Sequence, residues 1–210
     1  MNLGRQVRPR RPDRNVWARK VQRRPPTGRA HGLAVEVHAM TTHTSARMRR
    51  SPETVRQAVP GDEAYILALA DAALGAGYVD HAALASAACF VAVDAEEILG
   101  FVCVEPHTPQ CDERVLKTVV VAPAHRGRGI ARHLVLVALS AFPGSAWRSP
   151  AWVSHGGEIP ADRLLRSLGF VSEELIHNYW YIDSLSRGYL CPNCGNPCQC
   201  SAMIYHRVSP

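Results

Sequence analysis

The hydrophobic pattern divides the chain at about residue 51. Residues 1–50 show neither a helical nor a strand period and combine many arginines with four prolines, which predicts a disordered tail. Residues 51–210 alternate between apolar runs and turn residues such as Gly, Pro and Asp. That alternation of apolar runs and turn residues predicts one folded domain of ordinary size.

The folded part predicts the element order β-α-α-β-β-β-α-β-α-β-β, an α/β (α+β) mixed sheet with helices on both faces. Apolar residues at three- to four-residue spacing predict helices, with Asp62 as the N-cap of the first. β-branched and alternating runs predict strands. The expected helices are 63–74, 78–88, 130–142 and 160–168. The expected strands are 54–59, 89–93, 98–104, 115–121, 151–155, 174–183 and 202–208.

The basic charge of the chain belongs to the tail. Residues 1–50 carry 13 Arg/Lys and 2 Asp/Glu, a net of +11, whereas residues 51–210 carry 11 and 16, a net of −5. Charge therefore gives no reason to expect nucleic-acid binding by the folded part. Two alternatives stay open for the tail: a basic arm for RNA, DNA or anionic surfaces, and a translation start at Met40 or Met48.

Membrane and export signals are not visible in the sequence. No run approaches the roughly 20 apolar residues of a membrane-spanning helix, and Arg and Pro stand where a signal peptide has its apolar segment. We therefore expect a cytoplasmic protein without membrane contact. Its seven cysteines are then thiols or metal ligands in the first place, with Cys89 and Cys103 as buried thiols in strands.

The segment 119–131, VVVAPAHRGRGIA, carries the clearest chemical signal. It leaves a strand, passes a proline and enters a helix through Gly127 and Gly129. Glycines let a backbone approach a ligand closely, and the unpaired amides of a helix N-terminus bind anions. Arg126 and Arg128 add charge that suits phosphates. The spacing fits neither a P-loop nor a dinucleotide fingerprint.

This segment resembles the R/Q-x-x-G-x-G/A loop of the GNAT N-acetyltransferase superfamily, and Val121-Ala122-Pro123 resembles the V-x-P before it. Residues 161–170, ADRLLRSLGF, resemble the family's fourth-helix motif ending in Gly-Phe. The resemblance covers about residues 54–208 and implies a GNAT-like, mostly antiparallel sheet. It also implies that the Val119, Val120 and Val121 backbone binds the pantetheine of acetyl-CoA, and that the amides of Arg126, Gly127, Arg128, Gly129, Ile130 and Ala131 bind its pyrophosphate.

The resemblance further implies direct attack of a primary amine on the thioester, at a splay between the strands 115–121 and 151–155. Many family members carry a tyrosine as general acid where this chain has Leu165, which cannot donate a proton. Tyr179 and Tyr181, which alternate onto one face of the strand expected at 174–183, are the candidate replacements.

The sequence also leaves several candidates for the general base. Glu158 stands where many family members have Asn, and Glu105 lies at the end of a hairpin strand. Both carboxylates, His155 and water are candidates.

Four cysteines fall within ten residues: Cys191, Cys194, Cys198 and Cys200. Cys-Pro-x-Cys-Gly is a metal knuckle, and the following Cys-x-Cys completes four thiolates, which predicts structural Zn²⁺. Disulfides and iron–sulfur or redox use are the alternatives, and His206 is a further candidate ligand within a strand. The cluster precedes the last strand, where the resemblance places the acceptor side of the site. We expect residues 74–88 and this loop to line the acceptor.

The sequence thus predicts an acetyl-CoA-dependent N-acetyltransferase with an unidentified amine acceptor, either a small molecule or a protein. The alternatives are a non-catalytic acyl-CoA-binding module and a nucleic-acid binder acting through the tail and the knuckle. Loss of the usual tyrosine favours the first alternative, and the basic tail favours the second.

Overall fold

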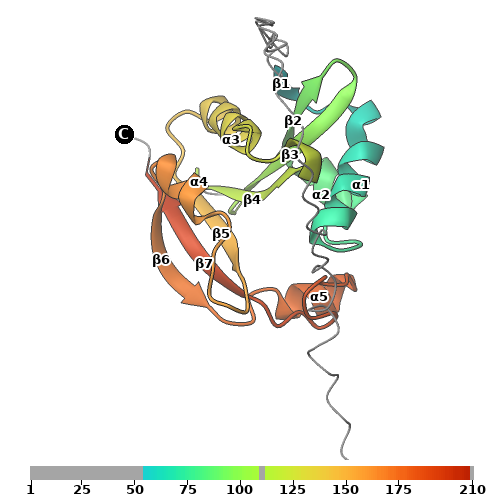
Figure 1. Ribbon diagram of the computed structural model, residues 1–210. Coiled ribbons are helices and arrows are strands. Elements are labelled where there is room, and N and C mark those ends of the chain that lie inside the picture. Colours follow the sequence, from blue (N-terminus) through green and yellow to red (C-terminus); the bar gives the residue numbers. More distant parts are fainter. Residues whose placement is uncertain (1–53, 109–111, 209–210) are drawn as a thin grey trace, which may run out of the picture. The chain divides into compact units, whose positions relative to one another are not determined.

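The computed structural model describes residues 54–108 and 112–208 (Figure 1). The tail at 1–50, with Met40 and Met48, lies outside the described residues, as does Cys111. Seven strands form one sheet in the order β1-β2-β3-β4-β5-β7-β6. They are β1 Thr54–Gln57, β2 Ala88–Asp94, β3 Glu97–Pro106, β4 Arg114–Val121, β5 Trp147–Val153, β6 Val171–Ile176 and β7 Ser201–Arg207.

Every strand pair of this sheet is antiparallel except β4 with β5, which is parallel. The mixed, mostly antiparallel sheet predicted from the sequence is therefore confirmed. The described helices are α1 Glu63–Leu74, α2 His81–Ser86, α3 Ile130–Ala141, α4 Asp162–Ser167 and α5 Tyr181–Arg187, with short 3₁₀ turns η1 Pro60–Asp62 and η2 Pro123–His125. None of these helices is long and apolar enough to cross a membrane.

Two apolar clusters show that helices cover both faces of the sheet (Figure 1). On one face, α3 and α4 pack their apolar side chains, Leu134 and Leu165 among them, against Trp147 and Tyr205. On the other face, Ile66 and Ala70 of α1 pack against Phe101 and Val120. Burial of such side chains is the main force that holds a helix on a sheet.

Cys89 and Cys103 are buried thiols, as predicted. They face each other across β2 and β3, with 2.8 Å between their Sγ atoms. The hydrogen bond between the two thiols, together with burial, keeps the pKa of the Cys103 thiol above its ordinary value. Both groups are thus built into the second apolar cluster.

Strand β4 contains a β-bulge at Lys117. Cys103 of β3 is opposite Thr118, but the next residue, Val104, is opposite Leu116, so Lys117 is the additional residue. The bulge changes which face the following side chains occupy. Leu116 therefore packs in the α3 cluster and Val120 in the α1 cluster, although an even spacing would put both on one face.

The sequence prediction fails in the strand at 174–183, whereas Asp62 does occupy the N-cap position of α1 without making the side-chain bond of a cap. The strand expected at 174–183 ends at Ile176, because the chain turns at Asn178, whose φ of 54° is one that Asn tolerates. Asp62 precedes α1, but its carboxylate makes no capping bond to that helix. It accepts instead from Val59 N at 2.8 Å and from the Arg56 guanidinium, which lowers the pKa of this carboxyl.

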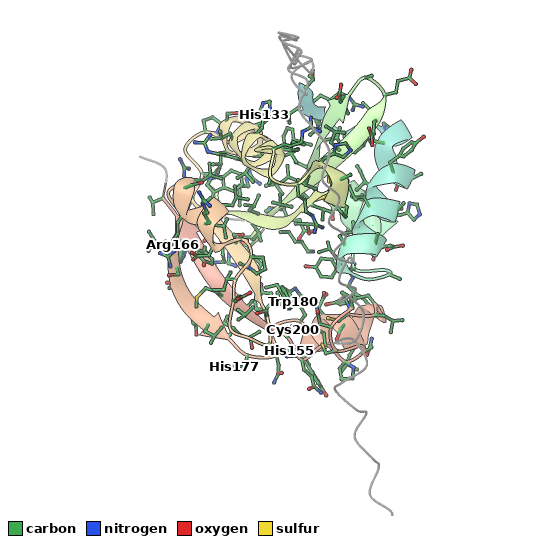
Figure 2. The ribbon with its side chains drawn as sticks, in the orientation of Figure 1. His133, His155, Arg166, His177, Trp180 and Cys200 are labelled. Carbon is green, nitrogen blue, oxygen red and sulfur yellow. The ribbon has the colours of Figure 1, made fainter. Side chains whose placement is uncertain are left out.

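The turn after β6 brings Tyr179 to the start of β7. Tyr179 N donates to Cys200 O at 3.0 Å, and Figure 2 shows Trp180 and Cys200 near one another at that end of the sheet. Tyr181 begins helix α5. The two tyrosines therefore do not share a strand face, contrary to the prediction.

Candidate functional site

The strands β4 and β5 separate soon after they begin. They pair only through Arg114 with Trp147 and Val115 with Arg148. At the next position the Ser149 hydroxyl donates to Leu116 O at 3.1 Å, in place of a strand pairing. In the part of the chain that the structure describes, no strand pairs with this edge of β4 beyond Val115. An open backbone edge therefore runs on toward Val121, as the splay predicted from the resemblance requires.

Strand β4 is followed by the loop that contains Gly127 and Gly129, and then by α3. Gly127 and Gly129 have φ angles of 75° and 86°. Residues other than Gly, Asn and Asp rarely adopt such positive values. A Cβ on either glycine would meet no atom within 4 Å, so the space above both is open. The first helical bond runs from His133 N to Gly129 O at 3.0 Å. The amides of residues 130–132 precede it, and such amides at a helix N-terminus can bind an anion.

The arginines of the loop brace it. Arg126 Nε donates to Val121 O at 3.1 Å, which ties the loop to the end of β4. Arg128 donates to His125 Nδ1 at 2.8 Å, so this His carries its proton on Nε2. That nitrogen faces Glu97 Oε1 at 3.2 Å. The loop is therefore held in shape by contacts within the protein.

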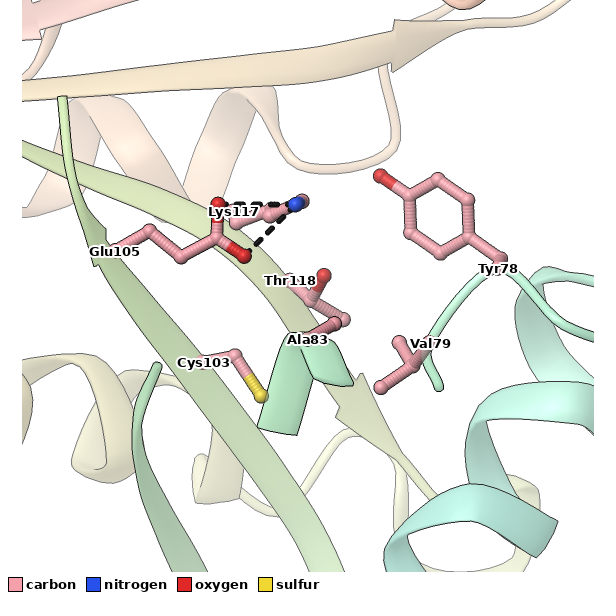
Figure 3. Close-up of a pocket in the computed structure, with 7 residues that line it drawn as sticks. All are labelled: Tyr78, Val79, Ala83, Cys103, Glu105, Lys117 and Thr118. Atoms are coloured by element: carbon pink, nitrogen blue, oxygen red, sulfur yellow. Dashed lines mark hydrogen bonds and ion pairs between the residues drawn. The ribbon is translucent and has the colours of Figure 1, made fainter. Parts of the chain in front are cut away.

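A small pocket lies beside the bulge of β4 (Figure 3). Lys117 Nζ donates to both carboxylate oxygens of Glu105, at 2.7 and 2.9 Å. The Tyr78 hydroxyl points across the pocket toward Lys117 (Figure 3), and burial raises the pKa of this phenol to about 12. The lining residues are Tyr78, Val79, Ala83, Cys103, Glu105, Lys117 and Thr118.

Of the predicted acid–base residues, Glu105 lines this pocket, and Tyr179, Tyr181, Glu158 and His155 are not among its lining residues. Burial raises the pKa of Tyr179, and the charges of Arg148 and Glu105 also act on it. Glu158 and His155 lie in the exposed turn between β5 and α4. Leu165 is fully buried in the α3 cluster. At this position of α4 the chain therefore has a buried apolar side chain and no proton donor.

Sequence reasoning overlooked Lys117, and it included Tyr78 only within the range 74–88 that was expected to line the acceptor site. Lys117 is the only charged residue within 115–121, and a lone charge in an apolar strand is a signal that could have been used. Tyr78 has no such signal. Its place in the pocket depends on how the segment between α1 and α2 folds onto the rest of the domain.

The four predicted metal ligands come together. The sulfurs of Cys191, Cys194, Cys198 and Cys200 all lie within 4.8 Å of one another. The Sγ–Sγ distances are 3.7 Å for Cys191–Cys200, 3.7 Å for Cys194–Cys198 and 3.5 Å for Cys194–Cys200. A tetrahedral Zn²⁺ with Zn–S bonds of about 2.3 Å separates its sulfurs by about 3.8 Å. The arrangement is close to that of a four-thiolate zinc site.

Backbone N–H groups surround these sulfurs. Gln199 N donates to Cys194 Sγ at 3.2 Å, and Gly195, with φ of 77°, closes the turn through a reciprocal pair of bonds with Cys191. Burial raises the pKa of Cys200 to about 11. His206 bonds Glu173 at 2.7 Å instead. It belongs to β7, as expected of a strand residue.

Comparisons with known proteins agree with this geometry. Residues 85–172 match the family model described as "Acetyltransferase (GNAT) domain". Similar solved structures include the ribosomal-protein-S18-alanine N-acetyltransferase from Escherichia coli, with 16% identity and a TM-score of 0.57 over 75% of this chain and 95% of that chain. Ard1 from Thermoplasma volcanium has 19% identity and a TM-score of 0.57 over 76% and 99%.

A GCN5-related N-acetyltransferase from Kribbella flavida has 23% identity and a TM-score of 0.55 over 74% of this chain and 97% of that chain. No curated protein matches the sequence. At these identities the solved structures show a shared fold, and the family model matches residues 85–172.

Proposed function

Because the chain contains a GNAT acetyltransferase domain, we propose that it transfers the acetyl group of acetyl-CoA to a primary amine. The observation that carries the proposal is the open edge of β4 that continues into the amides at the start of α3. A strand edge can pair with the amides of pantetheine, and a helix N-terminus can bind a pyrophosphate. Both lie on one continuous stretch of chain.

The residues proposed to hold acetyl-CoA act through their backbones. The backbone of Val119, Val120 and Val121 pairs with the pantetheine arm. The amides of residues 126–131, the loop from Arg126 to Ala131, bind the pyrophosphate. The two glycines support this role because their missing side chains leave open space above the loop.

Proton transfer is assigned to Glu105, which lines the pocket beside the bulge, and to Tyr179, which lies outside its lining. The acceptor amine must lose a proton to attack, and the departing thiolate must gain one. Glu105, held by Lys117, is the proposed base, with Glu158 as the alternative. Tyr179 is the proposed acid rather than Tyr181, since Tyr179 is held beside the start of β7 by its bond to Cys200 O, whereas Tyr181 lies in α5.

We expect Glu105→Gln to lower kcat by about 100-fold, because removing one general base costs about that much. Tyr179→Phe should lower kcat by about 10- to 100-fold on the same grounds. Tyr181→Phe is the matched control and should keep full activity. Steady-state kinetics on the three variants tests this assignment. Full kcat in both tyrosine variants would remove tyrosine from the mechanism.

The proposed activity is tested by incubating the full chain with acetyl-CoA and a panel of amines and measuring free thiol. The panel should include polyamines, amino acids, aminoglycosides, lysine peptides and peptides with free N-termini. We expect thiol release that depends on one class of amine. Tight acetyl-CoA binding without turnover would instead favour the non-catalytic module, which the apolar Leu165 already makes the second candidate.

We also propose that the four cysteines bind a structural Zn²⁺. The support is the set of near-tetrahedral sulfur distances and the N–H groups that donate to the sulfurs. Four thiolates leave no open coordination position, so this ion would take no part in acetyl transfer.

A further inference from the structure

The cysteine loop is bonded to helix α5 through one buried residue. Ser184 is fully buried, and its hydroxyl accepts from Cys198 N at 2.8 Å. Its carbonyl accepts from Asn196 Nδ2 at 2.7 Å. Both donors belong to the segment that carries the cysteines, so fixing this segment also fixes the middle of α5.

Helix α5 is bonded in turn to the segment 75–80, which joins α1 to α2. Arg187 donates to Tyr78 O at 2.8 Å and to Asp80 Oδ2 at 2.9 Å. Asp80 is also the N-cap of α2, because its other oxygen accepts from Ala83 N at 2.7 Å. Loss of the Arg187 contacts would therefore loosen both Tyr78 and the start of α2.

Two further contacts join the same segments. Leu190 N donates to Ala76 O at 3.3 Å, and the rings of Tyr78 and Tyr189 meet edge to face with 5.2 Å between centroids. Asn196 Nδ2 also donates to Tyr189 O at 3.1 Å. The contact is close: a Cβ on Gly75 would lie 2.0 Å from Leu190 O.

The segment 75–80 supplies one wall of the pocket. Tyr78 and Val79 line it opposite Glu105 and Lys117, and Ala83 of α2 lies beside them (Figure 3). The contacts of the acetyl-CoA loop run elsewhere. Arg126 bonds β4, and His125 bonds Arg128 and Glu97 at the start of β3. The cysteine loop and the acetyl-CoA loop are thus supported by different contacts.

We infer that the four-cysteine metal centre is a positioning device for the acceptor side of the pocket. Bound Zn²⁺ holds the cysteine loop, the loop holds α5, and α5 holds Tyr78 in the pocket wall. The ion thereby controls the pocket facing Glu105 without touching acetyl-CoA. The assignment of that pocket to an acceptor rests on the proposed acetyltransferase function. The mechanical coupling between the metal centre and Tyr78 does not rest on that function.

Hydrogen exchange on the full chain tests the coupling without any acceptor. Zinc-loaded protein is compared with protein stripped by a chelator under a thiol reductant. We expect stripping to speed amide exchange at least about 10-fold in residues 76–84 and 179–200, since local opening governs exchange. Exchange in α3 should change less than about 2-fold. Unchanged exchange in 76–84 after the zinc has left would overturn the inference.

A variant tests the hydrogen bonds of Arg187 to the segment 75–80 while the metal stays bound. Arg187→Gln should keep its zinc and show faster exchange in 76–84 only, whereas the control Arg163→Gln, at an exposed position of α4, should match the wild type in both. Retained zinc with unchanged exchange in Arg187→Gln would contradict the proposed route.

Kinetics with whichever amine of the panel is acetylated adds a second readout. Arg187→Gln should raise KM for that amine at least about 5-fold and leave the Kd of CoA, measured by calorimetry, unchanged. A variant that weakens CoA binding equally would show general damage and refute a positioning role. If the panel yields no acetylated amine, the proposed enzyme activity fails while the exchange result still decides the coupling.

Discussion

Acetyl-CoA binding should fall at least about 100-fold when Gly129 is replaced by aspartate, an effect of about 2.7 kcal/mol. Gly129 precedes α3 with φ of 86° and open space above it. Aspartate would place a negative charge where the proposal puts the pyrophosphate. Two unit charges about 4 Å apart near a protein surface repel by about 4 kcal/mol before salt screening. That estimate is large enough to support the expected loss.

The matched control is Gly129→Asn. Asparagine has nearly the same shape, and both residues tolerate a positive φ, so the pair differs mainly in charge. We expect Gly129→Asn to weaken binding about 10-fold through crowding alone, and the gap between the two to shrink as salt rises. Calorimetric titration with acetyl-CoA at two ionic strengths measures both. Equal affinities for the two variants would show that no anion binds at this helix end.

The parts of the fold that depend on local pattern were predictable. Helix α3 was expected at 130–142 and occurs at Ile130–Ala141, because its apolar period and the glycines before it are strong signals. The hairpin of β2 and β3 follows in the same way. The strand expected at 174–183 failed beyond Ile176, since the alternation of Tyr179 and Tyr181 imitates a strand. Asn178 reverses the chain, and Gly188 ends α5 with φ of 72°.

The parts of the candidate site also differ in how far the sequence predicts them. The loop 126–131, proposed to bind acetyl-CoA, and the cysteine cluster are each contiguous in sequence, so residue spacing alone predicts the chemistry of both. The pocket is built from segments far apart in sequence. Its shape depends on the bulge at Lys117 and on the packing of Tyr78 against Tyr189. Neither a one-residue change of register nor a contact across 111 positions leaves a local pattern that could be read.

Cys194→Ser is expected to lose the zinc and to lower the melting temperature by about 10 °C. Cys194 Sγ lies 3.5 Å from Cys200 Sγ and 3.7 Å from Cys198 Sγ, so its removal opens the centre of the cluster. A structural zinc site stabilises the folded state because the unfolded chain holds the ion poorly. A loss of about 3 kcal/mol corresponds to about 6–12 °C for a domain of this size.

Cys103→Ala is the control for this experiment, since it removes a buried thiol from the core and leaves the cluster intact. It should also be less stable than the wild type, because it leaves a cavity, yet keep one zinc per chain by elemental analysis. A chelator should then lower the melting temperature of the wild type and of Cys103→Ala, and leave that of Cys194→Ser unchanged. Removal of one ligand and removal of the ion are the same perturbation if the cluster binds zinc, so their effects must not add. Additive effects, or a wild type purified under reductant without zinc, would show that the four thiols stabilise the loop by some other means.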